Sequence, residues 1–366
     1  MSIPQIVVTG GPCAGKTTSF ARLQSWCWDK GIRAFILPEI ATELIQGGVN
    51  DIGAIAQNDF KLYLEFQRHI LLEQEARRKS LLGFASNFSG PSVIFFDRGG
   101  MDGKAYMPEG CFEDMLRDER LFLEQVRDSY TGVIHLVSAA EGAEEFYTTA
   151  NNTARRESAE EARALDRKTL NAWIGHPHLR VIDNSTDFEG KMRRLIAATA
   201  RMLGIPVPIE IEHKFLLGSM PDLSSIEGIQ SSRIEQIYLE SPLTQQTRIR
   251  KRVASDQSVM YYRTVKAMTA TSNTRLERED AIRWTEYLTL AKQQEAATKI
   301  IKKTRYCFVY KSQYFELDVF QNPSGLILLE RELTEENEHI DLPEFLDVVR
   351  DVTDEPEFSN YHLSRT

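Results

Sequence analysis

Residues 10–17 read Gly10-Gly11-Pro12-Cys13-Ala14-Gly15-Lys16-Thr17, directly after the apolar run Gln5–Thr9 and before a helical pattern. They fit G-x-x-x-x-G-K-[ST], in which glycines let backbone N–H groups close around phosphate oxygens. Lys16 is placed to reach the β- and γ-phosphates of a nucleotide, Thr17 to ligate Mg²⁺ and Thr18 to touch the α-phosphate. A preceding strand and a following helix are the context this pattern requires, so the stretch predicts a phosphate-binding loop.

Short apolar runs alternate with helical patterns around this loop. The runs are Gln5–Thr9, Ala34–Leu37, Ser92–Phe96, Val133–Val137 and Arg180–Ile182, and the helical patterns include Gln57–Lys79 and Phe188–Leu203. Nearly continuous apolar strands are typical of parallel sheets that are covered on both faces. The alternation therefore predicts an α/β domain with a doubly wound parallel sheet.

Two acidic residues follow predicted strands at the edge of the sheet where ligands bind. Asp97 ends one strand in Asp97-Arg98-Gly99, where it can hold Mg²⁺, accept a proton from a substrate hydroxyl, or simply cap the turn. Glu39 ends another strand, and an acid–base or acceptor-binding role and a structural role both stay open. Arg155, with Arg156, is a candidate for a lid over the phosphates, the alternative being a solvated helix face.

The pattern of predicted elements changes at residues 204–208, Gly-Ile-Pro-Val-Pro, which end the preceding predicted helix. We therefore predict two domains, residues 1–205 and 206–366. Apart from a helical stretch around Thr285–Thr298, the second part reads as about eight strands, listed here by residue: Ile209–Leu217, Arg233–Glu240, Thr247–Val253, Val259–Lys266, Arg275–Ala281, Lys302–Val309, Gln313–Phe320 and Gly325–Leu333. Antiparallel strands with one charged face predict a closed barrel with a polar interior.

Charged residues recur at every second position of these strands. The candidate metal-binding carboxylates are Glu210, Glu212, Glu277, Glu279, Glu316, Asp318, Glu330 and Glu332, and the candidate cationic residues of the same site are Lys214, Arg248, Arg250, Lys266 and Arg305. Carboxylates two positions apart point to one face of a strand and can clamp Mg²⁺ or Mn²⁺. Arginines bind phosphate oxygens in a bidentate manner and lysines act as point charges. The pattern predicts a site for a metal-bound polyphosphate, at which a metal that bridges phosphate and water would hydrolyse a phosphoanhydride.

Composition narrows the functional classes. The chain has 366 residues, 42% hydrophobic and 27% charged, with 44 Lys and Arg against 53 Asp and Glu for a net charge of −9. This balance argues against bulk binding to nucleic acid. The sequence has four scattered cysteines without a C-x-x-C pair, which favours a cytoplasmic protein. It shows no leader pattern and no long apolar run, so we expect no transmembrane segment, although peripheral membrane contact stays open.

Both halves resemble known families. The first, from the loop through the Asp97-Arg98-Gly99 turn to the run ending Gly175-His176-Pro177-His178, resembles nicotinamide riboside kinase-like P-loop proteins. The second resembles the CYTH family of triphosphate tunnel metalloenzymes, whose signature E-x-E-x-K stands as Glu210, Glu212 and Lys214, and whose later charged pairs match those given above. The resemblance implies an eight-stranded tunnel that hydrolyses a triphosphate with Mg²⁺ or Mn²⁺.

The combination of the two resembles the NadR-like/TRPL translocation defect protein family, for which GTP binding and phosphoinositide binding are implied. Three functions therefore stay open. The first is nucleoside triphosphate (GTP or ATP) binding with NTPase or phosphotransferase activity, together with hydrolysis of a triphosphate in the tunnel. The second is a GTP-regulated phosphoinositide-binding protein in membrane trafficking, and the third is a nucleoside or nicotinamide-riboside kinase with a non-catalytic CYTH sensor.

Overall fold

The computed structural model describes residues 3–147, 158–205, 211–224, 226–242, 244–268, 275–333 and 338–366. The contacts divide the chain into two compact units, Met1–Thr199 and Ala200–Thr366. The division falls in the last turn of a helix, shortly before the predicted boundary, and residues 206–210 lie outside the described ranges. Within those ranges, no helix is both long and apolar enough to cross a membrane. All four cysteines are described, and none of them forms a disulfide.

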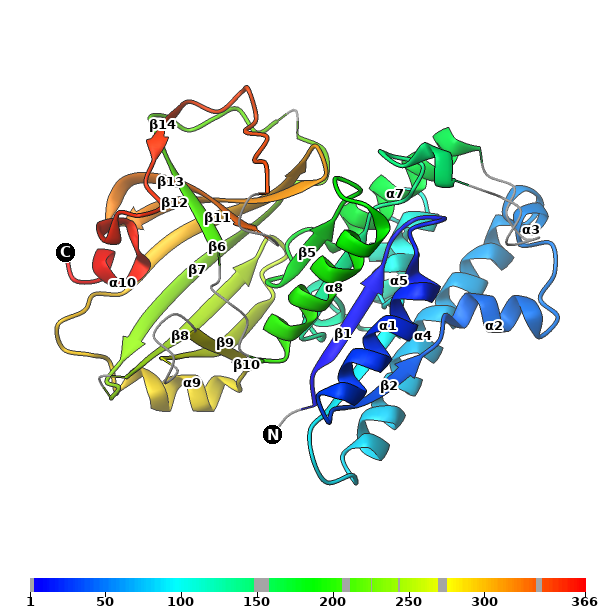
Figure 1. The fold of residues 1–366 in the computed structure, drawn as a ribbon, viewed down its shortest axis with the longest axis horizontal. Coiled ribbons are helices and arrows are strands. Elements are labelled where there is room, and N and C mark those ends of the chain that lie inside the picture. The colour runs from blue at the N-terminus through cyan, green and yellow to red at the C-terminus, as the bar shows by residue number, and fades with distance from the viewer. Residues whose placement is uncertain are drawn as a thin grey trace. The chain divides into compact units, whose positions relative to one another are not determined.

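The first unit is built on a five-stranded parallel sheet, as predicted (Figure 1). Its order is β2-β3-β1-β4-β5, and the strands are β1 (Gln5–Thr9), β2 (Arg33–Leu37), β3 (Ser92–Asp97), β4 (Gly132–Leu136) and β5 (Leu179–Ile182). β1, β3 and β4 are almost wholly buried, which explains their continuous apolar sequences. Parallel strands end at one edge, so the residues after β1, β2 and β3 are brought together there.

Helices connect these strands, and a further helix follows the last of them. They are α1 (Lys16–Asp29), α2 (Ile40–Gln46), α3 (Ile52–Asn58), α4 (Phe60–Ala85), α5 (Cys111–Asp118), α6 (Leu123–Arg127), α7 (Ala159–Trp173) and α8 (Phe188–Met202), with short 3₁₀ turns η1 (Asp102–Tyr106) and η2 (Glu144–Phe146). The prediction of one helix over Gln57–Lys79 was wrong at its start. Asp59 leaves helical geometry and its carboxylate accepts a hydrogen bond from the Leu62 N–H at 3.0 Å, so it ends α3 and caps α4.

The second unit is a nine-stranded antiparallel sheet in the order β10-β9-β8-β7-β11-β12-β13-β6-β14. The strands are β6 (Ile211–Leu217), β7 (Gln230–Leu239), β8 (Gln245–Ala254), β9 (Val259–Met268), β10 (Arg275–Ala281), β11 (Ile301–Tyr310), β12 (Gln313–Asn322), β13 (Ser324–Leu333) and β14 (Val348–Asp351), followed by η3 (Pro356–Phe358) and α10 (Asn360–Leu363). The eight predicted strands are present and β14 is an addition. In the described ranges no ladder joins the edge strands β10 and β14, so the closed barrel expected from the sequence is here a curled sheet (Figure 1).

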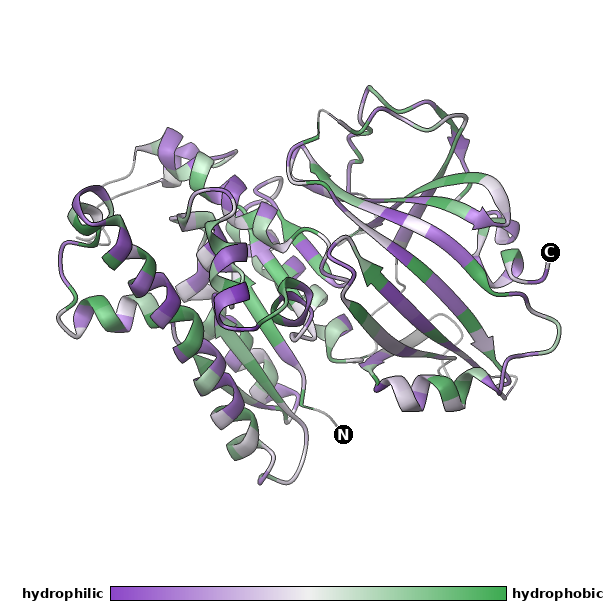
Figure 2. Cartoon of the chain, turned by 180° about the vertical axis from the view of Figure 1, so that it is seen from behind, coloured by the Kyte–Doolittle hydropathy of each residue, from purple (hydrophilic) through white to green (hydrophobic). Residues whose placement is uncertain are grey.

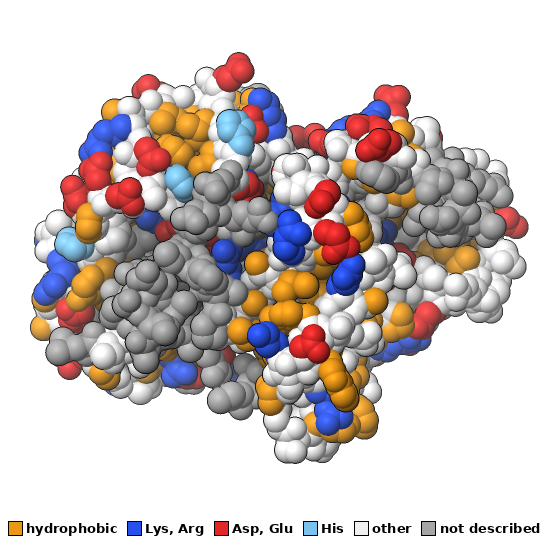
Figure 3. Space-filling model, in the orientation of Figure 1, with side chains coloured by type: hydrophobic (Ala, Val, Ile, Leu, Met, Phe, Trp, Pro, Cys, Tyr) orange, Lys and Arg blue, Asp and Glu red, His pale blue; other side chains and the backbone are white. Residues whose placement is uncertain are grey.

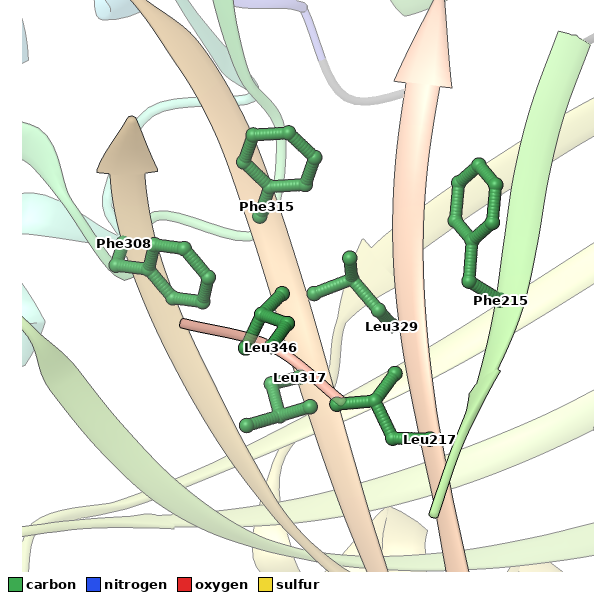
Figure 4. Packing of buried hydrophobic residues seen from close by; sticks show 7 residues of the cluster. All are labelled: Phe215, Leu217, Phe308, Phe315, Leu317, Leu329 and Leu346. Carbon is green, nitrogen blue, oxygen red and sulfur yellow. The ribbon is translucent and has the colours of Figure 1, made fainter. Parts of the chain in front are cut away.

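The sheet of the second unit has one apolar face and one charged face, and Figure 2 shows the resulting bands of alternating hydropathy along its strands. Apolar side chains pack in a cluster of Phe215, Leu217, Phe308, Phe315, Leu317, Leu329 and Leu346 (Figure 4). A second cluster joins Ile237, Leu239 and Ile249 to Tyr287 of helix α9 (Trp284–Ala291). Most of the hydrophobic core therefore lies on one side of the sheet, while a smaller buried cluster of Ile301, Phe320, Leu328 and Val352 lies beside the charged residues of the other side.

Helix α9 is shorter than the helical stretch around Thr285–Thr298 that the sequence predicts. It ends at Ala291, and the following residues turn back onto β7. The Glu240 N–H donates to the Gln293 carbonyl at 3.0 Å and the Glu295 N–H to the Tyr238 carbonyl at 2.9 Å. Pairing with a strand edge satisfies backbone groups that the helix would otherwise have used.

Candidate functional sites

The glycine-rich loop joins β1 to α1 and has the backbone that its sequence requires. Gly10 has φ 144° and Gly15 φ 89°, both in the region that favours glycine. A Cβ at Gly10 would lie 2.1 Å from the Leu136 carbonyl oxygen of β4. The other members of the loop lie where the motif places them, with Thr17 and Thr18 exposed on the first turn of α1. The loop thus offers the helix N-terminus and its N–H groups to an anion.

Lys16 reaches across this loop. Its Nζ donates hydrogen bonds to the carbonyl oxygens of Gly10 at 2.9 Å and of Gly11 at 3.2 Å. Burial, together with the positive charge of Arg98, lowers the pKa of Lys16, while the acids Asp97 and Glu39 act in the opposite direction. The ammonium group is therefore held at the loop beside both predicted acids, where a phosphate would give it a better partner than two neutral carbonyls.

Asp97 is the acid with the least internal compensation. Its Oδ1 is buried and has no hydrogen-bond partner among the described residues. Burial, helped by the neighbouring carboxylate of Glu39 and opposed by the attraction of Lys16, raises the pKa of Asp97 to about 6. The capping interpretation requires a hydrogen bond from the turn, and this oxygen accepts none. A buried carboxylate oxygen facing Lys16 fits a ligand that carries a cation or a hydroxyl proton.

Glu39 is bound to an arginine that the sequence reasoning did not assign. Arg98 lies at φ 69° directly after β3, and its Nε is 2.6 Å from Glu39 Oε1. Burial favours the neutral acid, but Arg98, Lys16 and a hydrogen bond from Thr42 together lower the pKa of Glu39. An ionised Glu39 at the sheet edge is suited to accept a proton or to orient a hydroxyl. Its neighbour Arg98 was visible in the sequence, but its pairing was not.

Two further buried acids that the sequence reasoning missed fasten the loop. Asp102 accepts hydrogen bonds from the Thr9 hydroxyl, from the Gly99 N–H at 2.7 Å and from Trp173 Nε1 at 3.3 Å. Asp166 of α7 accepts from the Gly11 N–H at 2.5 Å and lies 3.3 Å from His135 Nε2. No motif marks Asp102, and Asp166 begins the run that ends in Gly175-His176-Pro177-His178 but was given no role there. A single buried acid does not change the hydrophobic periodicity of the sequence, so its hydrogen-bond partners are seen only in the folded structure.

Some predicted residues lie outside the described ranges. These are Arg155, with its neighbour Arg156, and Glu210, and the side chain of Glu277 on β10 is likewise not described. Their proposed roles stay predictions. His176, in contrast, is described and is buried. Burial lowers its pKa to about 3, and its ring contacts the Tyr130 carbonyl and the His178 N–H. It is a satisfied core histidine.

In the second unit the strand register places the predicted charged residues on one face, called here the charged face. Lys214 lies opposite Glu330, Glu330 opposite Glu316, Asp318 opposite Arg305, Glu212 opposite Glu332, Arg248 opposite Thr264, Thr264 opposite Glu279, and Glu277 opposite Lys266. Arg250 follows on β8, two positions from Arg248. Residues directly opposite on neighbouring strands share a face, so the strands bring together residues more than a hundred positions apart.

Arg305 is the centre of one network on this face. Its guanidinium donates to Asp318 Oδ1 at 2.7 Å, to Glu330 Oε2 at 2.8 Å and to Glu316. Lys303, two positions from Arg305 on β11, also donates to Asp318. Burial opposes the charges of this network, but Lys214, Lys303 and Arg305 hold the pKa of Glu330 well below its usual range. Each of these charged groups contacts at least one group of opposite charge, which is what a buried ionic cluster requires.

A second group surrounds Lys214, whose Nζ lies 2.6 Å from Glu212 and 2.9 Å from Glu330. Burial and the nearby charge of Glu330 raise the pKa of Glu212, although Lys214 and Lys266 act against this. The Glu212 side chain nevertheless remains 41% exposed. Two carboxylates share one ammonium here, so negative charge is in excess at an accessible point. Such oxygen donors fit Mg²⁺ or Mn²⁺, although the described residues contain no ready-made group of three ligands.

The arginines of β8 make the opposite wall. Arg250 pairs with Glu279, whose carboxylate also accepts from the Thr264 hydroxyl at 2.6 Å. Arg248 interacts with the hydroxyl of Tyr238. The influence of Lys266 on Glu212 is informative because β8, β7, β11, β12 and β13 separate their strands in the sheet. The sheet must therefore curl toward its charged face, which brings both ends of the charge pattern together.

A glycine-rich phosphate loop on a parallel α/β sheet and an antiparallel sheet with an ionic inner face define a two-part protein: a P-loop domain followed by an antiparallel β domain. Residues 5–191 match the AAA domain family AAA_28, which spans just over half of the chain, and the chain belongs to that family. None of the curated proteins matches this chain.

Solved structures resemble the C-terminal part. The inorganic triphosphatase NE1496 is 27% identical, and the match covers 44% of this chain and 97% of that protein with a TM-score of 0.33. The PH1012 protein from Pyrococcus horikoshii OT3 is 20% identical over 35% of this chain and 80% of that protein, with a TM-score of 0.25. Because these TM-scores are low, we argue the chemistry of the second unit from its own residues.

Proposed function

We propose that the first unit binds a magnesium-bound nucleoside triphosphate and catalyses phosphoryl transfer or NTP hydrolysis. The proposal rests on Lys16 at the loop, close enough to attract the Asp97 carboxylate, whose buried Oδ1 accepts no hydrogen bond from the described residues. Lys16 would neutralise charge on the β- and γ-phosphates, and the loop N–H groups would hold them. Thr17 and Asp97 would hold Mg²⁺, which supplies charge neutralisation of the phosphates when bound.

Glu39 supports transfer to an acceptor as well as hydrolysis. Arg98 and Lys16 lower the pKa of Glu39 against the effect of burial, which favours its ionised form. The carboxylate can therefore accept a proton from an attacking hydroxyl or water near the terminal phosphate. Arg98 is buried, with its pKa raised by Tyr106, Glu39 and Asp102 despite the cost of burial, and it keeps the Glu39 carboxylate in place. Arg155 is proposed to close over the phosphates.

We further propose that the charged face of the second unit binds and hydrolyses an inorganic triphosphate or polyphosphate with Mg²⁺ or Mn²⁺. The proposal rests on the shared face of the acids and bases, where Lys214, Arg248, Arg250, Lys266 and Arg305 would exchange their present partners for phosphate oxygens. Glu212 and Glu330, helped by Glu316 and Asp318, would hold the metal. The metal would supply an activated water and polarise the terminal phosphate.

Phosphate release tests this second activity. Wild-type protein with tripolyphosphate and Mg²⁺ or Mn²⁺ should release phosphate, and Glu212→Gln should release at least about a hundredfold less because a metal ligand is lost. Glu235→Gln is the matched control, since Glu235 pairs with Lys251 on the opposite face of the same sheet. Equal rates in wild type and Glu212→Gln, or no release by wild type, would contradict the proposal.

A second candidate function is binding without hydrolysis. It is favoured by the network at Arg305, in which the carboxylates of Glu316, Asp318 and Glu330 are already paired with a cationic side chain. A site of this kind would accept a phosphoinositide headgroup or act as a polyphosphate sensor. Retention on phosphoinositide vesicles that depends on GTP against GDP, with no phosphate release, would establish the trafficking alternative. A phosphorylated product from a nucleoside or nicotinamide riboside panel, lost in Lys16→Ala, would establish the kinase alternative.

A further inference from the structure

Phe188 is an exposed aromatic residue placed directly at the phosphate loop. It begins α8, and 43% of the residue is accessible to solvent. A Cβ built at Gly15 would lie 3.0 Å from Phe188 Cε2 and 3.7 Å from Cζ. The ring edge therefore covers the backbone of the glycine that precedes Lys16, while much of the ring remains open. The ring thus lies against the phosphate loop with part of its surface accessible to a ligand.

The start of α8 is firmly held, so the ring has a defined position. Asp187 Oδ1 accepts from the Gly190 N–H at 2.7 Å and caps the helix. Glu189 pairs with Arg22 of α1 at 2.6 Å, which ties the two helices beside each other (Figure 1). The preceding segment is fixed by the buried Arg194, which donates to Asp183 Oδ1 at 2.7 Å and to the Thr186 hydroxyl at 3.0 Å.

The chemistry of the ligand explains such a ring. A triphosphate needs cations and N–H groups, which the loop supplies, and has no use for an apolar surface. The nucleoside is attached to the α-phosphate, which is expected beside the first turn of α1. Thr18 is exposed on this turn, and Phe188 borders the loop. The base is the one part of a nucleotide with a flat π-face, and stacking on an aromatic ring is its ordinary mode of recognition.

We propose that Phe188 stacks on the base of the nucleotide, a subsite that rests on the proposed nucleotide binding of the first unit. The phenyl ring has no donor or acceptor, so it stabilises adenine and guanine alike and contributes affinity without choosing between them. It also separates nucleotides from base-free phosphates at the loop. The first unit therefore binds a nucleoside triphosphate in preference to tripolyphosphate.

The test compares ligands with and without a base at the site that depends on Lys16. Retention of radiolabelled ATP with Mg²⁺ is measured for wild type and Lys16→Ala, and the difference defines binding at the loop. Phe188→Leu, which keeps an apolar contact with Gly15, and Phe188→Ala should both bind ATP and GTP about 5- to 30-fold more weakly. Phe188→Tyr and Phe188→Trp should bind within about twofold of wild type. Competition by tripolyphosphate at this site should be unchanged in all of them.

Three results would overturn the subsite. ATP binding by Phe188→Leu that equals wild type would show that the ring does not stack on a base. An equal loss of ATP and tripolyphosphate binding would show that Phe188 only shapes the loop. If Lys16→Ala leaves ATP binding unchanged, the nucleotide site itself fails, and this outcome is distinct from the first two. Phe188→Tyr and Phe188→Leu keep the test decisive if Phe188→Ala does not fold.

Discussion

At the scale of single residues, Asp97 and Glu39 show how position sets the behaviour of two similar acids. Both follow strands of one sheet and both face Lys16. Glu39 is paired with Arg98, which lowers its pKa against the effect of burial, whereas burial of Asp97 raises its pKa to about 6. The two carboxylates are thereby suited to different tasks: Glu39 to proton acceptance, and Asp97 to a cation that supplies the missing compensation.

Asp97 predicts a pH dependence. A carboxyl group with a pKa of about 6 is ionised above that pH and protonated below it, so Mg²⁺-dependent nucleotide binding should be present at pH 7 and weaken about tenfold by pH 5. Asp97→Asn should bind weakly at both pH values and abolish this dependence. Calorimetric titration with and without Mg²⁺ measures it. Burial raises the pKa of Asp97 in the folded state, so ionisation of Asp97 lowers the stability of the fold as the pH rises. Asp97→Asn removes this charge and should therefore not lower the melting temperature at pH 7. An unchanged pH profile in the variant would contradict the assignment.

At the scale of elements, Asp102 holds three segments together at the loop. It joins the end of β1 through Thr9, the turn after β3 through Gly99, and α7 through Trp173. The sequence predicted the strands and helices that meet here but not their fastening. Apolar runs and glycine patterns report which segments are buried, whereas a single buried carboxylate gains its partners only from the tertiary fold.

Asp102→Ala leaves buried donors of Thr9, Gly99 and Trp173 without an acceptor. We expect a loss of about 2–4 kcal/mol in the free energy of unfolding of the first unit. Urea unfolding followed by tryptophan fluorescence measures it. Asp114→Ala is the control, because its pair with Arg117 is exposed and should contribute less than about 1 kcal/mol. Similar losses in the two variants would show that Asp102 does not hold the loop.

The charged face illustrates what sequence does and does not predict about the second unit. Period-two alternation predicted that Arg248 and Arg250, or Glu316 and Asp318, share a face, and the register agrees. The alternation carries no information on pairing across strands. It did not indicate that one residue, Arg305, contacts three carboxylates, nor that Lys303 joins them. Helix ends were likewise missed, because Asp59 and the turn after Ala291 depend on local hydrogen bonds.

At the scale of the whole molecule, the net charge of −9 hides its distribution. On the side shown in Figure 3, acidic and basic side chains of the described residues are interspersed, without a large area of one sign. We propose that the charges that bind phosphate lie at Lys16 and on the charged face. An acidic protein can therefore bind polyanions, because local cations decide binding and the total charge only sets the background.

The division into two units predicts that each site works without the other. Separately expressed fragments of residues 1–205 and 206–366 should each fold, the first with nucleotide binding and the second with tripolyphosphate hydrolysis. Their urea midpoints should match the two transitions of the full chain if each core is complete. Insolubility of both fragments, or loss of both activities on separation, would contradict independent domains.

We propose, above all, that one chain carries two phosphate sites of different kinds. The most direct measurement is phosphate release from MgATP and from tripolyphosphate by wild type, Lys16→Ala and Glu212→Gln, side by side. Lys16→Ala should abolish the release from MgATP that depends on the loop and keep the tripolyphosphate activity, and Glu212→Gln should do the reverse. If either substitution abolishes both activities, or if neither affects its own substrate, the account of two separate sites is contradicted.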